Sequence, residues 1–118
     1  MTRWREVDPA LRELDAEGES VIVTQLIQVF LENTPMLISE ARNAIGQGSA
    51  ADVARLGHTL KGSCSNFGAN RLRVASARLE QLVGGGSITG AGALLADIER
   101  EFAFVRAALE RELTVCAV

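Results

Sequence analysis

Apolar residues recur at intervals of three and four along most of this chain, which is the periodicity of an amphipathic α-helix. The first long run of this kind begins near Glu19 and is interrupted by Pro35. Pro35 either kinks one long helix or opens a second helix with Thr34 as its N-cap, and the pattern does not decide between the two. The residues of this run predicted to face a core are Val23, Leu26, Ile27, Phe30, Leu37, Ile38, Ala41 and Ile45.

Three more helices are predicted downstream, each bounded by residues that favour turns. The first covers roughly residues 50–67 and ends at Gly68, a C′ glycine. The second covers about residues 71–83, with Asn70 as its cap, and the last follows a glycine-rich stretch, residues 84–92, predicted as a flexible loop. The residues of these helices predicted to face inward are Val53, Leu56, Leu60, Cys64, Phe67, Leu72, Ala75, Leu79, Leu82, Val83, Leu94, Leu95, Ile98, Phe102, Val105, Leu109 and Leu113.

The chain begins with a further, shorter helix signal. Asp8 followed by Pro9 is a cap-then-first-residue pair, which predicts a helix from about Pro9 to Glu17, with Trp4 and Val7 tucked against the body ahead of it. No strand pattern and no internal repeat are visible. The sequence therefore predicts an all-α fold, an antiparallel four-helix bundle with an additional short N-terminal helix, as a single domain over residues 1–118.

Composition narrows the classes of function. The 118 residues carry a net charge of -3 and no cluster of basic residues, which argues against nucleic acid as a partner. No run of 18 or more apolar residues and no apolar leader at the N-terminus is present, so we expect neither a membrane span nor secretion. The two cysteines, Cys64 and Cys116, do not form a C-x-x-C pair and are expected as reduced thiols in a cytoplasmic monomer.

His58 is the only histidine of the chain, and helical geometry assigns it to the solvent side of its helix. At about 100° per residue from Val53, the apolar stripe centres at about 345° and His58 falls at about 140°. Its neighbours on the helix surface are Ala54, Lys61, Gly62 and Ser65, three of which are small. Lys61 is the only lysine among the 12 lysine and arginine residues of the chain.

An exposed imidazole beside an ammonium, with small residues around it, suits a nucleophile that accepts and passes on a dianionic group. Gly62 costs about 1 kcal/mol of helix stability relative to alanine, and clearance beside the imidazole is a sufficient reason for it. Gly57 lies at about 40° on the same helical wheel and fits close packing of a neighbouring helix better. The plain alternative is a solvated helix face carrying His58 and Lys61, with Cys64 as an inert thiol in the core.

These residues resemble the signature of histidine-containing phosphotransfer (HPt) domains, H-x-L-K-G-S…L-G-A…L…L-E. The similarity covers nearly the whole chain, and its central motif is specific. The residues that carry it are His58-Thr59-Leu60-Lys61-Gly62-Ser63, Phe67-Gly68-Ala69-Asn70, Leu72 and Leu79-Glu80.

The resemblance implies roles for four residues. His58 is expected as the phosphoacceptor, at Nε2, and Lys61 as the basic neighbour that helps to neutralise the phosphoryl oxygens. Gly62 is expected to leave room for an incoming receiver domain. Glu80 occupies the position where family members carry Gln or Glu, and it is expected to accept a hydrogen bond from Nδ1 and so fix the tautomer of the ring.

The resemblance also implies a phosphorelay carrier rather than an enzyme, with no ATPase or autokinase motif. Its partners are expected to be the receiver domains of a hybrid sensor kinase and of a response regulator. We expect no metal and no cofactor on this chain, because the Mg²⁺ belongs to the partner receiver. Some relatives have a further basic residue where this chain has Gly84, and Arg55 is the candidate substitute.

Two other functions stay open from the sequence. A helical-bundle adaptor would bind receiver or kinase domains without transferring phosphate, and replacement of His58 by alanine would separate it from a carrier. A metal or thiol enzyme is disfavoured, because one histidine and two distant cysteines do not supply a zinc ligand set.

Overall fold

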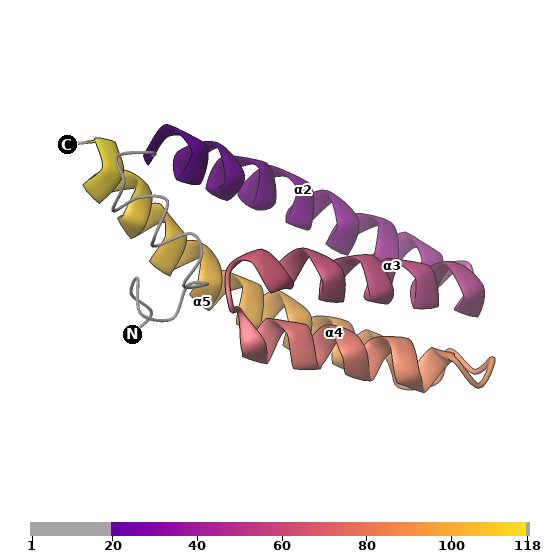
Figure 1. The fold of residues 1–118 in the computed structure, drawn as a ribbon. Helices are drawn as coiled ribbons and strands as arrows, with labels where there is room; N and C mark the ends of the chain where they lie inside the picture. Colours follow the sequence, from indigo (N-terminus) through magenta and orange to yellow (C-terminus); the bar gives the residue numbers. More distant parts are fainter. Residues whose placement is uncertain (1–19, 118) are drawn as a thin grey trace.

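The computed structural model describes residues 20–117, which form four α-helices and one short 3-10 turn (Figure 1). The predicted helix at residues 9–17, together with Trp4 and Val7, lies outside the described residues. Within the described part, no strand is present. The elements are α2 (Ser20–Gly46), α3 (Ala50–Ser63), η2 (Cys64–Asn66), α4 (Asn70–Val83) and α5 (Ala91–Ala117).

The four helices form an antiparallel bundle, as predicted. Each helix packs against two neighbours, in the order α2, α3, α4, α5 and back to α2. Helices α2 and α5 have 27 residues each and α3 and α4 have 14 each. The 13 additional residues of each long helix correspond to about 20 Å at 1.5 Å per residue. Figure 1 shows the long pair extending beyond the short pair. An ion pair between Arg42 and Glu99 joins α2 to α5 at the surface.

The predicted apolar stripes meet in one continuous core. Phe30 of α2 contacts the rings of Phe67 and Phe102 at centroid distances of 4.8 and 5.9 Å. These rings tie α2 to α5 and to the segment that follows η2. The buried residues of the core are Val23, Ile27, Phe30, Ile38, Ala41, Ala44, Val53, Leu56, Leu60, Cys64, Phe67, Leu72, Ala75, Leu79, Val83, Ala91, Leu95, Ile98, Phe102 and Leu109.

Helix α2 continues through Pro35 without a break, so no second helix opens there. Thr34 is not an N-cap: it is 1% exposed in the core, and its Oγ1 has no hydrogen-bond partner in the described part of the chain. Proline removes one backbone hydrogen bond from a helix. The buried side chains of Phe30 and Ile38, on either side of Pro35, hold the two halves on the same core and offset that loss.

Between α3 and α4, the predicted role of Gly68 is confirmed, whereas the predicted N-cap of α4 is wrong. The predicted helix over residues 50–67 ends at Ser63 and continues as the turn η2. Gly68 has a φ of 62°, the left-handed conformation that favours glycine at a C′ position. Asn70 does not cap α4, because the N-cap is Ala69 and Asn70 is already the first helical residue.

The core face of α4 also differs from the prediction at two residues. Leu82 is predicted to face inward but is 37% exposed, and Ser76 is fully buried instead. On the helical wheel, Ser76 lies about 50° from the centre of the Leu72–Leu79 stripe, and Leu82 lies about 70° from that centre on the opposite side. Burial of the serine is possible because its Oγ donates a hydrogen bond to the carbonyl of Leu72 at 2.8 Å.

The glycine-rich loop between α4 and α5 is shorter by two residues than predicted. Helix α5 begins at Ala91, so Gly92 lies inside the helix and the connection covers residues 84–90. Gly86 and Gly90 have φ values of 89° and 85°, which other residues rarely adopt.

One described helix has the length and composition that a membrane-spanning helix also has. It is the segment Val21–Gly46, with a mean hydropathy of 1.4. In this fold its apolar stripe lies in the bundle core, and the charged residues Glu32, Glu40 and Arg42 lie exposed on its other side. The core accounts for only part of its apolar character, because 28% of its most apolar stretch is buried and Val21, Ile22, Val29 and Met36 are exposed.

Candidate functional site

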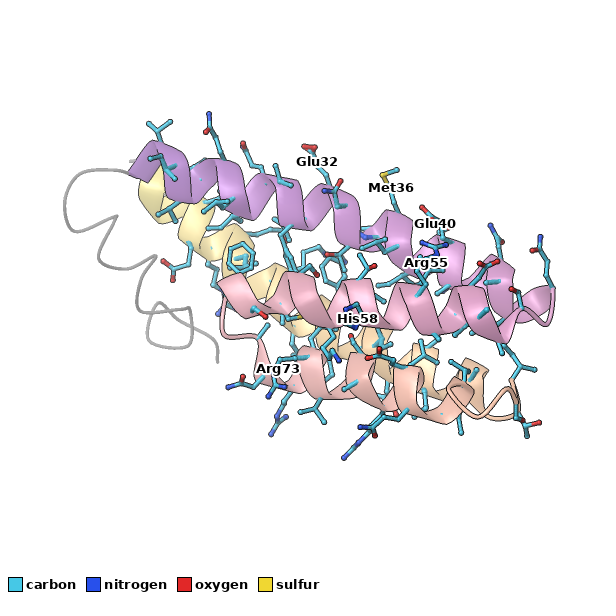
Figure 2. The ribbon with its side chains drawn as sticks, turned by 45° about the vertical axis from the view of Figure 1, so that its right-hand side comes forward. Glu32, Met36, Glu40, Arg55, His58 and Arg73 are labelled. Carbon is cyan, nitrogen blue, oxygen red and sulfur yellow. The ribbon has the colours of Figure 1, made fainter. Side chains whose placement is uncertain are left out.

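His58 lies on α3 with its side chain 68% exposed, on the side predicted from the helical angle. The core residues Leu56 and Leu60 point the opposite way, at 1% exposure each. Because the apolar stripe fixes the rotation of α3 against the bundle, the imidazole is held outside it. Figure 2 shows the ring on the outer face of α3, between α2 and α4.

Gly57 brings α4 close to α3 beside this histidine. A Cβ atom at Gly57 would lie 3.2 Å from the backbone nitrogen of Glu80 and 3.3 Å from the carbonyl oxygen of Ser76. A side chain at this position would require α4 to move away by a few tenths of an ångström, so glycine allows the closer approach. The packing role predicted for Gly57 is therefore confirmed, and it sets the backbone of Glu80 next to the turn that carries His58.

Glu80 joins the two basic groups of the site. Its Oε2 lies 3.0 Å from Nδ1 of His58, and its Oε1 accepts a hydrogen bond from Nζ of Lys61 at 2.8 Å. Both Glu80 and Lys61 are half-buried, at 29% and 33% exposure, whereas the imidazole is open to solvent. One carboxylate thus spans both side chains that the sequence singles out.

The charge of Glu80 follows from these contacts. The hydrogen bond from Lys61 lowers the pKa of the Glu80 carboxyl below its ordinary value, and the charges of Lys61 and His58 act in the same direction, against partial burial. Glu80 is therefore ionised near neutral pH and can only accept hydrogen bonds. A neutral His58 consequently carries its hydrogen on Nδ1 and leaves the lone pair on Nε2. No hydrogen-bond partner of Nε2 is found among residues 20–117.

The small residues predicted around His58 leave space on the outer side of α3. A Cβ atom at Gly62 would meet no atom within 4 Å. Ala54 is half-buried on α3, and Ser65 is exposed on η2. Arg55 is not brought to His58: its guanidinium lies 4.0 Å from Asp52, and Figure 2 shows it on the side of α3 toward α2.

The ion pair of Lys61 with Glu80 is the part of the site that sequence reasoning missed. A signal for it was available, because Lys61 falls at about 80° on the helical wheel, between Gly57 at about 40° and His58 at about 140°. A residue between the helix-contact glycine and the histidine faces the neighbouring helix. The helical wheel of α3 does not show which residue of α4 Lys61 contacts.

Cys64 has the environment of a core thiol rather than of a reactive one. It is 2% exposed, its Sγ donates to the carbonyl of Leu60 at 3.2 Å, and burial raises the pKa of its thiol to about 11. This thiol is protonated and enclosed, as expected for a core cysteine. Within the described residues, no group of three or more metal-binding side chains is found.

Comparison with known proteins gives a consistent set of matches. The family model of the Hpt domain matches residues 25–114. The chain is similar to the crystal structure of histidine-containing phosphotransfer protein B from Pseudomonas aeruginosa, with a TM-score of 0.82, 27% identity, and coverage of 92% of this chain and 95% of that chain.

Two further structures share the fold. The histidine-containing phosphotransfer protein from maize has a TM-score of 0.79 at 22% identity, covering 94% of this chain and 84% of that chain. The Hpt domain of a sensor hybrid histidine kinase from Shewanella has a TM-score of 0.71 at 16% identity, covering 92% and 94%. The comparison with curated protein sequences finds no match.

Proposed function

The chain belongs to the Hpt domain family, phosphotransfer proteins of two-component phosphorelays, and we propose that His58 is the residue that carries the phosphoryl group. The donor is the aspartyl phosphate of one receiver domain, and the acceptor is the receiver aspartate of a response regulator. One observation carries the proposal: the lone pair on Nε2 points to solvent while a carboxylate holds Nδ1. Members of the family are phosphoryl carriers rather than catalysts.

The transfer step uses the two ring nitrogens differently. The lone pair of Nε2 attacks the phosphorus of the aspartyl phosphate in line, the N–P bond forms, and the P–O bond to the aspartate breaks. The aspartate leaves with that electron pair as a carboxylate. The ring keeps its hydrogen on Nδ1 and becomes positively charged, and the carboxylate of Glu80, 3.0 Å from Nδ1, stabilises that charge.

The remaining contributions are positioning and charge. Lys61 provides an ammonium next to the ring, and a compact ammonium makes point contacts with phosphoryl oxygens. Gly62 keeps the outer surface of α3 low beside the ring, which supports close approach of a receiver. The Mg²⁺ of the reaction is expected in the partner receiver. This chain therefore binds the receiver, orients the ring of His58 and neutralises part of the phosphoryl charge.

The surface around His58 suits docking of a folded domain. His58 lies ten residues after Gly48 and Ile38 ten residues before it, so in the antiparallel pair α2 and α3 these residues lie at one level. Met36 lies next to that level on α2 and is 61% exposed, with the exposed carboxylates of Glu32 and Glu40 one turn away on either side. Figure 2 shows these three residues along the outer face of α2. We propose that the receiver covers this part of α2 together with α3.

Transfer from phosphorylated receivers tests the proposal. The native protein is expected to take up label that is stable to base and labile to acid, the behaviour of phosphohistidine, and His58→Ala is expected to take up none. Asn43→Ala, an exposed change on α2 near the turn, is the control and should behave as the native protein. Label on the His58→Ala protein, or no label from any receiver on a protein whose circular dichroism is helical, would refute it.

An adaptor without transfer is the second candidate function. The observation that favours it is the exposed apolar row of Ile22, Val29 and Met36 on α2, which suits binding whether or not phosphate moves. An adaptor would keep its complex and its signalling output after His58→Ala, whereas a carrier would lose the output and keep the complex.

A further inference from the structure

Glu80 has a second effect on this site, through its contact with Lys61. The ammonium lies 2.8 Å from Oε1 of Glu80, while the other carboxylate oxygen is at Nδ1 of His58. Lys61 is therefore held on the Nδ1 side of the ring. A phosphoryl group on Nε2 would lie on the other side, away from the ammonium in its present position.

Two anions would compete for Lys61 once Nε2 is phosphorylated. The phosphoryl oxygens offer a dianion, and Glu80 offers a carboxylate already in hydrogen-bond contact. Lysine can move between them because its ammonium sits on a flexible four-carbon stem. Among the described residues, Lys61 is the only lysine or arginine found in an ion pair with Glu80, so no second cation of this kind relieves the competition.

We infer that Glu80 is a positioning residue that retains Lys61 and thereby shortens the lifetime of the phosphohistidine. This inference rests on the proposed function, because it takes Nε2 of His58 as the phosphorylated atom. The competition leaves the phosphoryl group less neutralised than a freely available lysine would. The carrier is then biased toward giving up its phosphoryl group rather than storing it.

Glutamine at position 80 isolates this effect. Its amide oxygen can still accept the hydrogen bond from Nδ1, but it has no charge with which to hold an ammonium. A partly exposed ion pair changes an equilibrium or a rate by about fivefold at most. Release of Lys61 should therefore lengthen the phosphohistidine half-life by up to about fivefold.

The experiment labels the protein with phosphoramidate and follows decay of the phosphohistidine signal by ³¹P NMR at neutral pH, with no receiver present. The proteins are the native chain, Glu80→Gln, Lys61→Met and the double variant, with Glu101→Gln on α5 as a control for loss of one carboxylate. We expect a longer half-life for Glu80→Gln than for the native protein, by up to about fivefold. Glu101→Gln should not change it. In the Lys61→Met background, Glu80→Gln should change the half-life by less than a third of the effect that it has in the protein with Lys61.

A second measurement follows Lys61 directly. Lys61 is the only lysine of the chain, so a sample labelled with ¹⁵N-lysine gives a side-chain ammonium signal that assigns itself. Because Glu80 retains the ammonium, phosphorylation of His58 is expected to shift that signal less in the native protein than in Glu80→Gln.

The outcomes separate the inference from the proposed function. The inference is overturned if the phosphohistidine half-life of Glu80→Gln is equal to or shorter than that of the native protein. It is also overturned if Glu80→Gln lengthens the half-life by the same factor in the Lys61→Met background as in the native background. An ammonium shift on phosphorylation that is as large in the native protein as in Glu80→Gln also overturns it, and in each of these cases His58 remains the carrier. If neither phosphoramidate nor any phosphorylated receiver labels the folded protein, the proposed function fails and the inference fails with it.

Discussion

The two glycines that flank His58 in α3 are expected to respond differently to the same substitution, glycine to alanine. A Cβ atom at Gly57 would lie 3.2, 3.3 and 3.4 Å from backbone atoms of α4, which cannot rotate away as a side chain can. A Cβ atom at Gly62 would meet nothing within 4 Å. The pair therefore separates the helix propensity of alanine from its fit between two helices.

The magnitudes follow from these distances. Alanine stabilises a helix interior by about 0.5–1 kcal/mol relative to glycine, and Gly62→Ala should gain that amount. Gly57→Ala has the same gain, but α3 and α4 must separate by a few tenths of an ångström, and overpacking of this kind costs about 1–3 kcal/mol. Gly57→Ala should therefore be less stable than Gly62→Ala by about 1–3 kcal/mol.

Urea and thermal unfolding followed by circular dichroism measure this difference, which should appear as a Tm lower by roughly 3 °C or more for Gly57→Ala than for Gly62→Ala. The native protein should lie between the two, or close to Gly57→Ala. A Gly57→Ala protein that unfolds at or above the temperature of Gly62→Ala would refute the close approach of α4 to α3 at this point. It would also remove the reason given for the position of Glu80.

Three further predictions concern single buried or half-buried groups. Thr34→Val should raise the free energy of unfolding by about 1 kcal/mol in urea titrations, because a buried hydroxyl without a partner is replaced by a methyl group of similar shape; a less stable variant would show that the hydroxyl is satisfied. Folding lowers the pKa of Glu80 below its ordinary value of 4.5, so the ionised carboxylate stabilises the folded state when the pH of the solution is above 4.5. This stabilisation is lost as the pH falls through the lowered pKa of the folded state. Urea midpoints at pH 7 and pH 3 should therefore differ less for Glu80→Gln than for the native protein, and ¹³C NMR of the Glu80 carboxyl should give a higher pKa in Lys61→Met. Cys64, with a pKa of about 11, should react with a thiol reagent at pH 8 only after unfolding, measured in a Cys116→Ser background; rapid reaction of the folded protein would contradict its burial.

Residues whose environment is decided within one helix were predictable from sequence. His58 and Gly57 are of this kind, because the apolar stripe of α3 fixes the rotation of the helix and every other position follows from it. The left-handed Gly68 is also local, since it closes a helix in a way that few other residues can.

Residues whose environment depends on a neighbouring element were not predictable in the same way. Pro35 disfavours a continuous helix locally, and only packing of α2 on the core decides that the helix continues. Ser76 is buried and the predicted core residue Leu82 is exposed, because the packing of neighbouring helices decides which edge of the α4 stripe is covered and the serine hydroxyl bonds to its own helix. The contact of Lys61 with Glu80 joins two helices whose relative axial register the apolar pattern does not give.

A count of charges at the site shows what glutamate contributes that glutamine would not. Before transfer, the neutral ring, the ammonium of Lys61 and the carboxylate of Glu80 sum to zero. After transfer, the dianionic phosphoryl group and the positive ring leave the site with one negative charge, whereas glutamine at position 80 would leave it neutral. In the proposed transfer, Glu80 would stabilise the ring charge that develops as the N–P bond forms, and it would oppose the dianion that remains afterwards. The first effect favours formation of the phosphohistidine and the second favours its loss, which suits the proposed role of an intermediate carrier.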